Sequence, residues 1–315
     1  SVASYAYMAT YTTSLPDGRY TFGPGTQTLY QGYYAGVMAN PDLKWETTTQ
    51  ANVGIDAALF KNKLLLTLDY YDKRTKDILI NPPALGAYGS IGNQLINGAT
   101  VHNKGFEATI TYRDQIRDFS YDVSFNISSY KNKVTSLGND AQPIYGPKFR
   151  DAYSITRTDV GHPIGYFYGY KVAGVYQSQA DIDASPKNTL ATVTPGDLKF
   201  ADVNGDGEIT PEDRTMIGNP TPKVTYGFSL GVDYKNWSLG IDMMGQGGNK
   251  IFRTWDNYNF AQFNYLEQRL DRWHGEGTSN TQPLLNTKHS INNLNSDYYI
   301  EDGKFFRIRN VQLAY

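Results

Sequence analysis

One stretch of the sequence carries oxygen side chains at the spacing that a calcium ion requires. In residues 202–213, Asp202, Asn204 and Asp206 stand at positions 1, 3 and 5, and Asp213 stands at position 12. Calcium binds six to eight oxygen atoms, and this spacing wraps carboxylate and amide oxygens around one ion. Gly207, at position 6, permits the sharp turn that the wrapping needs. The stretch therefore predicts a calcium-binding loop.

Two further positions complete the predicted ligand set. Glu208, at position 7, offers its backbone carbonyl, and Thr210 offers a hydroxyl or a bound water. Because position 12 is Asp and no long amphipathic helix flanks the loop, it resembles the dockerin-type variant of the EF-hand loop. The predicted cofactor is a structural Ca²⁺ held by Asp202, Asn204, Asp206, Glu208 and Asp213. A surface turn rich in Asp and Asn, without metal, is the alternative that the sequence leaves open.

The composition of the chain limits the classes of fold and function that are expected for the protein that carries this loop. The chain has 315 residues and a net charge of -2, which gives no reason to expect nucleic-acid binding, and it has no cysteine. Its 26 tyrosines and 30 glycines favour strands and turns over helices. Its mean hydropathy is -0.51, typical of a soluble protein, but the strands of a membrane barrel escape hydropathy because every second residue is polar. No signal peptide opens the chain, so we expect a fragment of a longer protein.

Apolar and polar residues alternate with a period of two over much of the chain. After the calcium loop, for example, Val224, Tyr226 and Phe228 alternate with Thr225 and Gly227, which predicts a strand with one apolar and one polar face. About eight such strands are predicted, each near or above the roughly 9–11 residues that span a membrane. They are residues 1–13, 44–60, 64–73, 106–113, 119–128, 224–234, 237–244 and 305–315.

The connectors between these strands alternate strictly between short and long. Residues 61–63, 115–118 and 235–236 are short turns, whereas the residues before 44 and residues 81–103, 138–223 and 248–303 form long connections. Outer-membrane barrels connect their strands in this way, with turns on the periplasmic side and loops outside. We therefore place residues 165–177, which have strand character, inside the extracellular loop 138–223 together with the calcium loop 202–213.

Two local irregularities carry predictions of their own. Phe263, Leu266, Leu270 and Trp273 have helical spacing and end at Gly275, which predicts a short helix packed as a lid element in the last long loop. The final strand changes phase, because its apolar residues move from even to odd positions. This change predicts a β-bulge near residues 309–310.

Several stretches spread over most of the chain together resemble one family. In the family's order, they are Asn40-Pro41-Asp42-Leu43-Lys44-Trp45-Glu46, Gly161-His162-Pro163-Ile164-Gly165, residues 196–213, Ile217-Gly218-Asn219-Pro220, Arg272-Trp273 and residues 301–310. Jointly they resemble the C-terminal barrel part of a SusC/RagA-type TonB-dependent outer-membrane transporter of the Bacteroidetes.

The resemblance implies an all-β fold in which residues 1–315 form an antiparallel transmembrane β-barrel segment with long extracellular loops. The whole barrel would have roughly 22 strands and a plug. It would import oligosaccharides or oligopeptides across the bacterial outer membrane, pair with a SusD-like surface lipoprotein, and contact membrane lipid and lipopolysaccharide. TonB would energise it through an N-terminal part, since neither a TonB box nor a plug domain is found in these residues. The resemblance transfers no substrate-contacting residue to this chain.

Other classes of function compete with this interpretation. A secreted adhesin or carbohydrate-binding module, in which calcium staples the ligand loop, would have two packed sheets instead of a barrel. An enzyme is not predicted. The G-x-S-x-G sequence around Ser229 lies within strand alternation, whereas a nucleophile requires a strand-to-helix turn. A glycoside hydrolase would need a carboxylate pair in a cleft. Glu107, Arg113 and Asp122 face the predicted lumen, where they would line a solute path or simply fill space.

Overall fold

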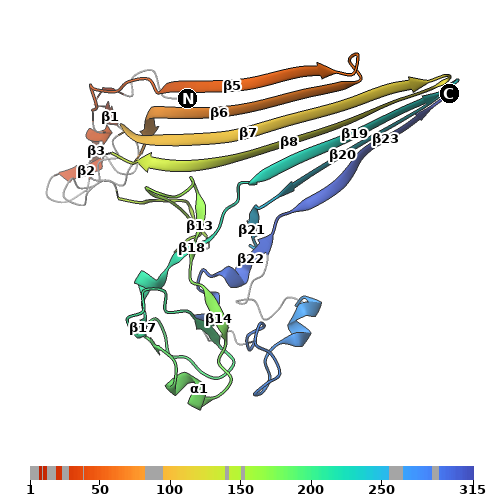
Figure 1. Cartoon of the computed structure of the whole chain (residues 1–315). Helices are drawn as coiled ribbons and strands as arrows, with labels where there is room; N and C mark the ends of the chain where they lie inside the picture. The colour runs from red at the N-terminus through yellow and green to blue at the C-terminus, as the bar shows by residue number, and fades with distance from the viewer. Residues whose placement is uncertain are drawn as a thin grey trace.

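A seven-stranded antiparallel sheet dominates the structure, a computed structural model (Figure 1). The structure describes residues 7–8, 10–12, 19–22, 28–37, 39–81, 95–138, 142–149, 153–254, 265–285 and 291–315. In spatial order the sheet runs β23-β20-β19-β8-β7-β6-β5. Its strands are β5 (Thr47–Leu59), β6 (Leu64–Ile80), β7 (Ile96–Ile116), β8 (Phe119–Ser136), β19 (Val224–Tyr234), β20 (Trp237–Gly247) and β23 (Phe305–Ala314).

The three short turns lie at one end of this sheet, and the long connectors leave from the other end (Figure 1). The predicted turn of residues 235–236 joins β19 to β20, and the turn between β7 and β8 is tighter than predicted, at residues 117–118. Lys61, Asn62, Arg117 and Lys235 all have positive φ in these turns. Such backbone matches the twist of a tight hairpin.

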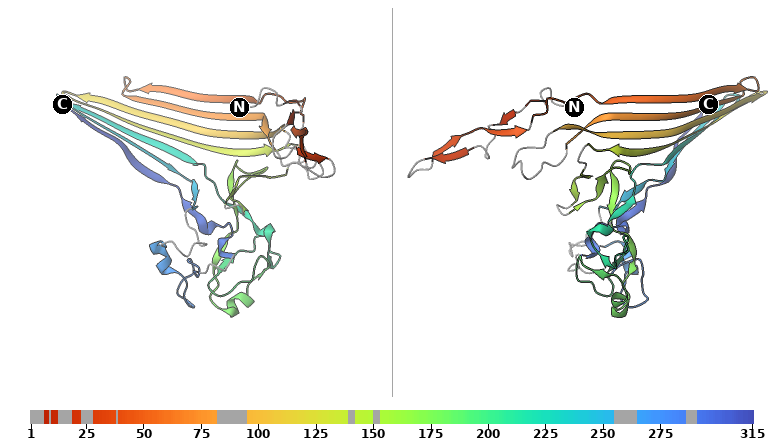
Figure 2. Two further views of the ribbon diagram at one scale, coloured as in Figure 1. Left: turned by 180° about the vertical axis from the view of Figure 1, so that it is seen from behind. Right: turned by 60° about the vertical axis from the view of Figure 1, so that its left-hand side comes forward.

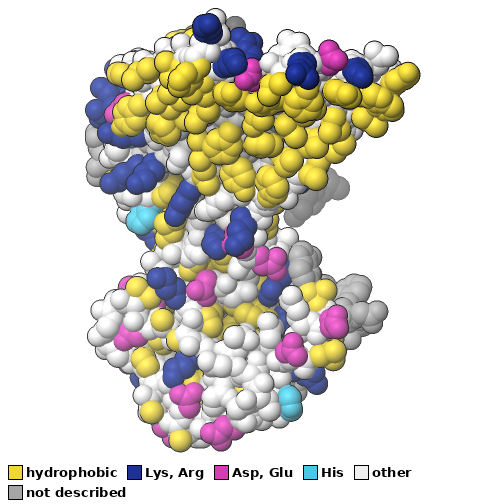
Figure 3. All heavy atoms as spheres, turned by 45° about the vertical axis from the view of Figure 1, so that its right-hand side comes forward, with side chains coloured by type: hydrophobic (Ala, Val, Ile, Leu, Met, Phe, Trp, Pro, Cys, Tyr) yellow, Lys and Arg dark blue, Asp and Glu magenta, His cyan; other side chains and the backbone are white. Residues whose placement is uncertain are grey.

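One face of the sheet is apolar from edge to edge. Its central row pairs residues across all seven strands: Ala57, Leu66, Ile110, Phe125, Phe228, Met243 and Ile308. Many side chains of this face are nevertheless exposed, for example Val53 at 72% and Leu313 at 65%. Figure 3 shows them as a continuous yellow expanse with Lys and Arg side chains at its edges. Because burial of each large apolar side chain is worth roughly 1.5–3 kcal/mol, this face requires an apolar environment outside the chain.

A bulge in β23 keeps the apolar face continuous. Asn310 pairs with Asp242 and Ile308 pairs with Met243, so Arg309 is the extra residue between them. In a regular strand without a bulge, Ile308 and Val311 would point to opposite faces, because they are three residues apart and the side chains of a strand alternate. The predicted bulge is confirmed.

The last two long connectors fold into a separate compact unit, which we call the loop body, at the end of the sheet from which they emerge (Figures 1 and 2). It comprises most of residues 142–223 and 249–303. Its elements are β9 (Ile144–Tyr145), β10 (Lys148–Phe149), β11 (Tyr153–Ser154), β12 (Thr156–Thr158), β13 (Tyr166–Gly169), β14 (Val172–Val175), α1 (Gln179–Asp183), β15 (Lys187–Asn188), β16 (Leu198–Phe200), β17 (Glu208–Ile209), η2 (Pro211–Asp213), β18 (Thr215–Gly218), β21 (Lys250–Phe252), η3 (Glu267–Asp271), η4 (Ile291–Asn293), η5 (Asp297–Tyr299) and β22 (Ile300–Asp302).

The loop body has a hydrophobic core of its own. Tyr170 stacks on Phe200 with ring centroids 4.8 Å apart, and Leu198, Ile209 and Ile291 have no exposed surface. Ile291 comes from the second long connector, whereas the other four come from the first. The two connectors therefore fold together, and the prediction that residues 165–177 lie outside the sheet is confirmed by β13 and β14.

Several predictions need correction. Among the described residues the sheet has seven strands, whereas about eight were predicted, because β1 (Thr10–Thr12) pairs with β4 (Tyr34–Val37). The connectors expected before residue 44 and in 81–103 also contain strands: β2 (Arg19–Phe22) pairs with β3 (Thr28–Gln31), and β7 begins at Ile96. Short segments with weak alternation pair locally, so their pattern does not reveal their partner.

The predicted lid helix is also different in the structure. Phe263 lies outside the described residues, and the following residues form only the short 3-10 helix η3. Leu270 is 70% exposed, whereas Arg269 is buried and donates to Gln282 at 3.3 Å. Of the predicted apolar residues, Trp273 packs against the core of the loop body, whereas Leu266 and Leu270 are exposed. Among the described residues, no helix is long and apolar enough to cross a membrane.

We expect Phe200→Ala to open the loop body without unfolding the sheet. The substitution removes a fully packed ring from a core, which costs about 3–5 kcal/mol. Limited proteolysis of the detergent-solubilised protein should then cut residues 142–223 faster. The heat-dependent shift in gel mobility that reports an intact barrel should not change. Val203→Ala, at an exposed position of the same connector, is the control; equal cleavage of the two variants would contradict the assigned core.

Candidate functional site

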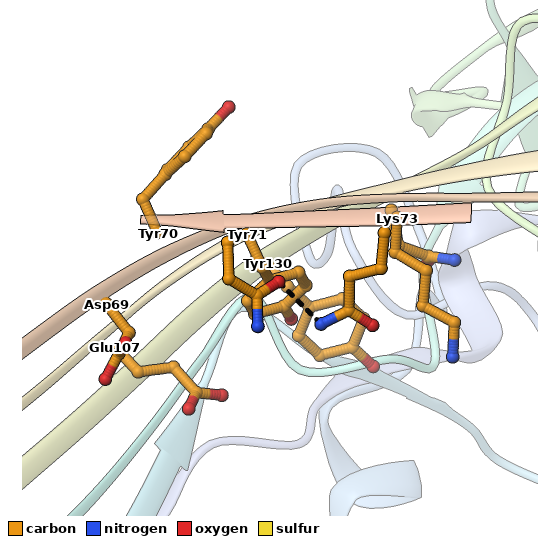
Figure 4. Close-up of a pocket in the computed structure, with 9 residues that line it drawn as sticks. Asp69, Tyr70, Tyr71, Lys73, Glu107 and Tyr130 are labelled. Atoms are coloured by element: carbon orange, nitrogen blue, oxygen red, sulfur yellow. Dashed lines mark hydrogen bonds between the residues drawn. The ribbon is translucent and has the colours of Figure 1, made fainter. Parts of the chain in front are cut away.

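The polar face of the sheet contains a hollow of about 440 Å³ toward the end where the long connectors emerge (Figure 4). We call it the polar-face hollow. Its polar lining comes from four neighbouring strands and consists of Gln50, Asn52, Asp69, Tyr71, Lys73, Asn103, Glu107 and Tyr130. Tyr70 also borders it, but its side chain points to the opposite side of the sheet (Figure 4). Because side chains alternate along strand β6, Asp69, Tyr71 and Lys73 lie on one face of the sheet and Tyr70 lies on the other.

A glycine makes room for the aromatic rings of the hollow. Asn52, Tyr71, Gly105 and Tyr130 form one cross-strand row over β5, β6, β7 and β8. A Cβ atom at Gly105 would overlap the ring of Tyr71. The ring therefore lies across the neighbouring strand in space that any other residue would fill. This covering of a strand glycine by an aromatic ring also restores packing that the glycine lacks.

The hollow carries more negative than positive charge. Asp69 lies directly opposite Glu107 in the β6-β7 pair, an arrangement that destabilises a sheet unless a cation or a donor offsets it. Lys73 lies two residues beyond Tyr71, on the same face of the sheet. The hydroxyl of Ser128 donates to Glu107 Oε1 at 3.4 Å. Gln50 Nε2 donates to Asn52 Oδ1 at 2.7 Å. This combination of acids, amides and phenol rings suits polar solutes or a polypeptide segment.

The structure brings only one of the three predicted lumen-facing residues into this hollow. Glu107 lines it, whereas Arg113 and Asp122 are cross-strand partners near the short turns. The sequence identified the polar face but did not identify Tyr71 and Tyr130 as a pair. The feature of the sequence that could have indicated this pair is Gly105, a small residue among larger ones in a long strand.

Ser229 has no surroundings that would make it a nucleophile. It lies in the middle of β19, and its hydroxyl donates to Asp242 Oδ1 at 2.9 Å on the neighbouring strand. A nucleophile elbow requires the strand to turn sharply into a helix at the serine. The strand continues to Tyr234, so the structural role that the sequence predicts for Ser229 is consistent with its geometry.

The predicted calcium loop lies in the loop body, where it begins shortly after β16, includes β17 and ends with η2. Its side-chain oxygens accept hydrogen bonds from the backbone of the loop itself. Asp202 accepts from the N–H groups of Gly205 at 2.6 Å and Gly207 at 2.9 Å. Asn204 and Asp206 each accept from the N–H group two residues further on, at 3.0 and 2.9 Å. The bonds of Asn204 and Asp206 close Asx turns, and together with those of Asp202 they fix the curvature of the loop.

The remaining two predicted ligands have other partners. Asp213 is fully buried, and its carboxylate accepts from the N–H groups of Val203 at 2.8 Å and Thr210 at 2.7 Å, the latter as part of a capping box. The side-chain carboxylate of Glu208 lies 3.3 Å from Lys187, whereas the ligand atom predicted for Glu208 is its backbone carbonyl. In the part of the chain that the structure describes, no three His, Cys, Asp or Glu side chains are grouped to hold a metal ion. Calcium binding therefore stays a prediction.

Buried polar residues that the sequence did not reveal join the two long connectors. Asn292 donates to Asp197 Oδ1 at 2.9 Å and accepts from the N–H group of Leu198 at 2.7 Å. Burial raises the pKa of Asp297, whose carboxylate accepts from the N–H group of Val172 at 2.8 Å. A hydrogen-bonded partner removes much of the cost of burying a polar group. These bonds fix how the connectors pack.

Together, these features define a class of protein. An antiparallel sheet with an exposed apolar face, a polar opposite face, short turns at one end and long loops at the other is a segment of a membrane β-barrel wall. A family model described as "TonB dependent receptor-like, beta-barrel" matches residues 3–264. The chain belongs to this family, as its resemblance to SusC and RagA predicted.

Named relatives agree with this assignment. TonB-dependent receptor P3 of Formosa agariphila is 32% identical over 295 residues, which cover 88% of this chain and 28% of the relative. TonB-dependent receptor SusC of Bacteroides thetaiotaomicron is 25% identical over 321 residues, which cover 99% of this chain and 30% of SusC. The chain thus spans less than a third of the length of these relatives. They are receptors, and the family is not one of enzymes.

Solved structures show the same fold. The RagAB peptide importer in its "open-open" state matches with a TM-score of 0.74 and 22% identity, over 99% of this chain and 32% of that one. Its "closed-closed" state matches with a TM-score of 0.72 and 23% identity. At this level of identity the likeness concerns the fold alone.

We expect Gly105→Ala to destabilise the barrel by about 1–3 kcal/mol, because the added methyl group forces the Tyr71 ring to move. The loss should be partly recovered in the Gly105→Ala, Tyr71→Ala double variant, which removes the ring. Urea unfolding of the four proteins in the cycle measures the coupling. Gly240→Ala, where a Cβ meets nothing within 4 Å, is the control. Additive effects of the two substitutions would contradict the assigned contact.

Proposed function

We propose that the protein of which this chain is a part imports nutrient oligomers, either glycans or oligopeptides, across a bacterial outer membrane with energy from TonB. The observation that carries the proposal is the two-faced sheet in a chain of the TonB-dependent receptor-like family. In a barrel, the apolar face contacts lipid and the polar face lines the lumen. The polar-face hollow would then border the path of the solute or contact a plug within the lumen.

A SusD-like surface lipoprotein is the partner that we propose for the loop body. SusC is among the relatives, and structures of RagAB, a peptide importer, are among the solved structures that match. The loop body extends from the sheet at the end that would lie outside the cell (Figure 2). Its own core makes it a firm platform, which a docking partner needs to avoid the cost of ordering mobile loops.

The chemistry of the hollow is compatible with either substrate class. Phenol rings such as those of Tyr71 and Tyr130 stack on sugar faces and on peptide side chains, and amides such as Asn103 hydrogen-bond to both. The carboxylates of Asp69 and Glu107 favour a substrate or plug segment with cationic groups. The proposal therefore keeps both glycans and oligopeptides.

Uptake by whole cells tests the proposal. We expect a strain that lacks the gene to lose uptake of labelled oligomers of one class, and the wild-type gene to restore it. Tyr71→Ala with Tyr130→Ala should reduce uptake about tenfold, because stacking on one ring is worth about 0.5–1.5 kcal/mol. Tyr70→Ala, the neighbour that faces the other side of the sheet, is the matched control.

The uptake experiment requires that the protein be located in the outer membrane, and cell fractionation tests this. The protein should be extracted from outer membranes with detergent, together with a lipoprotein. A product that is soluble without detergent would contradict the proposal and favour the secreted calcium-stapled adhesin or carbohydrate-binding module.

We also propose that residues 202–213 bind a structural Ca²⁺. The spacing of Asp202, Asn204 and Asp206, and the hydrogen bonds from the loop backbone to their side chains, support it. Asp202→Ala with Asp206→Ala should make the connector 142–223 more sensitive to protease in calcium buffer. The wild-type protein should gain the same sensitivity when a chelator is added. Cleavage that is equal with and without chelator in the wild type would exclude a stapling calcium ion.

A further inference from the structure

A cluster of cationic side chains lies next to the apolar face of the sheet, at the end where the long connectors emerge. We call it the basic patch. It consists of five exposed residues on three adjacent strands: Arg74 and Lys76 on β6, Lys104 on β7, and Lys131 and Lys133 on β8. The side chains belong to the same face as the apolar residues, because each stands an even number of residues beyond them in its strand.

The register of the strands brings the cations together. Lys104 pairs with Lys131 and with Asp72 in one cross-strand row. In the next row, Arg74 and Lys133 lie on either side of His102. Neighbouring strands are about 4.8 Å apart, and successive residues on one face are separated by about 7 Å. The patch is therefore small enough for several cations to reach one or two phosphate groups.

The charge of the patch is not balanced by the chain. Asp72 is the acidic residue in these two rows, and it is held by Lys104 at 3.1 Å and by His102. Among the described residues, Arg74, Lys131 and Lys133 form no ion pair with a carboxylate. Like charges directly opposite each other destabilise a sheet. An anion supplied from outside would offset this repulsion.

The position of the basic patch along the strands, just beyond the apolar face, identifies the source of that anion. The last apolar row contains Val53, Tyr70 and Phe106, and aromatic residues of this kind mark the boundary between hydrocarbon and headgroups. Lys104 precedes Phe106 by two residues, which is about 7 Å along the strand toward the end where the long connectors emerge. The cations therefore stand at the level of the headgroups, on the side that faces lipid.

We propose that the basic patch binds the phosphate groups of lipopolysaccharide in the outer leaflet. The inference rests on the proposed function, since it requires the sheet to span the outer membrane with its long connectors outside. Binding would anchor the β6-β8 part of the wall and fix the depth of the barrel. Lys73 supplies an internal contrast, because it lies beside Arg74 in the same strand but points into the polar-face hollow (Figure 4).

The test uses the full protein, purified from outer membranes in a mild detergent, with purified lipopolysaccharide as the probe. The test variant carries Arg74→Gln, Lys104→Gln, Lys131→Gln and Lys133→Gln. Lys73→Gln is the matched control. We expect the fourfold variant to bind lipopolysaccharide at least tenfold more weakly, because one cation near an anionic membrane surface contributes roughly fivefold. The control should bind like the wild type.

A second arm does not depend on the variants. Enzymatically dephosphorylated lipopolysaccharide should bind the wild-type protein about as weakly as intact lipopolysaccharide binds the fourfold variant. Equal binding of the two lipid forms, or of wild type and a variant with normal heat-dependent gel mobility, would overturn the assignment. A protein absent from the outer membrane would instead refute the proposed function, so the two failures are distinguishable.

Discussion

The structure depends on the requirement that a backbone in an apolar medium must satisfy all of its hydrogen bonds. A sheet meets this requirement only by continuous pairing, and the pairing then sets which side chains share a face. In this chain seven strands pair in sequence from β5 to β23, and the apolar row from Ala57 to Ile308 remains unbroken. The bulge at Arg309 shows how strictly the face is maintained, since it accommodates one extra residue and so keeps Ile308 and Val311 on the same face.

The same alternation determines where the polar and charged side chains of the chain lie. Residues that alternate with the apolar face turn to the other side, where Tyr71, Tyr130 and Gly105 shape the polar-face hollow and Asp69 and Glu107 give it charge. Beyond the apolar face the strands continue, and their side chains become cationic on the lipid side. Where the strands end, the chain no longer has a sheet to pair with. The long connectors then pack on each other around Phe200 and Ile291.

The sequence was sufficient to predict most of the sheet, because period-two alternation is a local signal. The hairpin of β19 and β20 and the bulge in β23 followed from it, and the exclusion of residues 165–177 from the sheet followed from the alternation of short and long connectors. The loop body was not predictable in the same way. Its core joins Phe200 to Ile291, and its buried Asp197 pairs with Asn292, contacts that no local pattern reveals. The hollow was missed for a related reason, since Tyr71 and Tyr130 become neighbours only through register.

The most direct test of the account is the accessibility of successive positions along β6. The chain has no cysteine, so single cysteines at positions 66–71 can each carry a spin label in the membrane-embedded protein. The account predicts that labels at 66, 68 and 70 collide with oxygen dissolved in lipid, and that labels at 67, 69 and 71 collide with a water-soluble nickel complex. Accessibility without a period of two, or contact with water at all six positions, would contradict a barrel wall with one face in lipid.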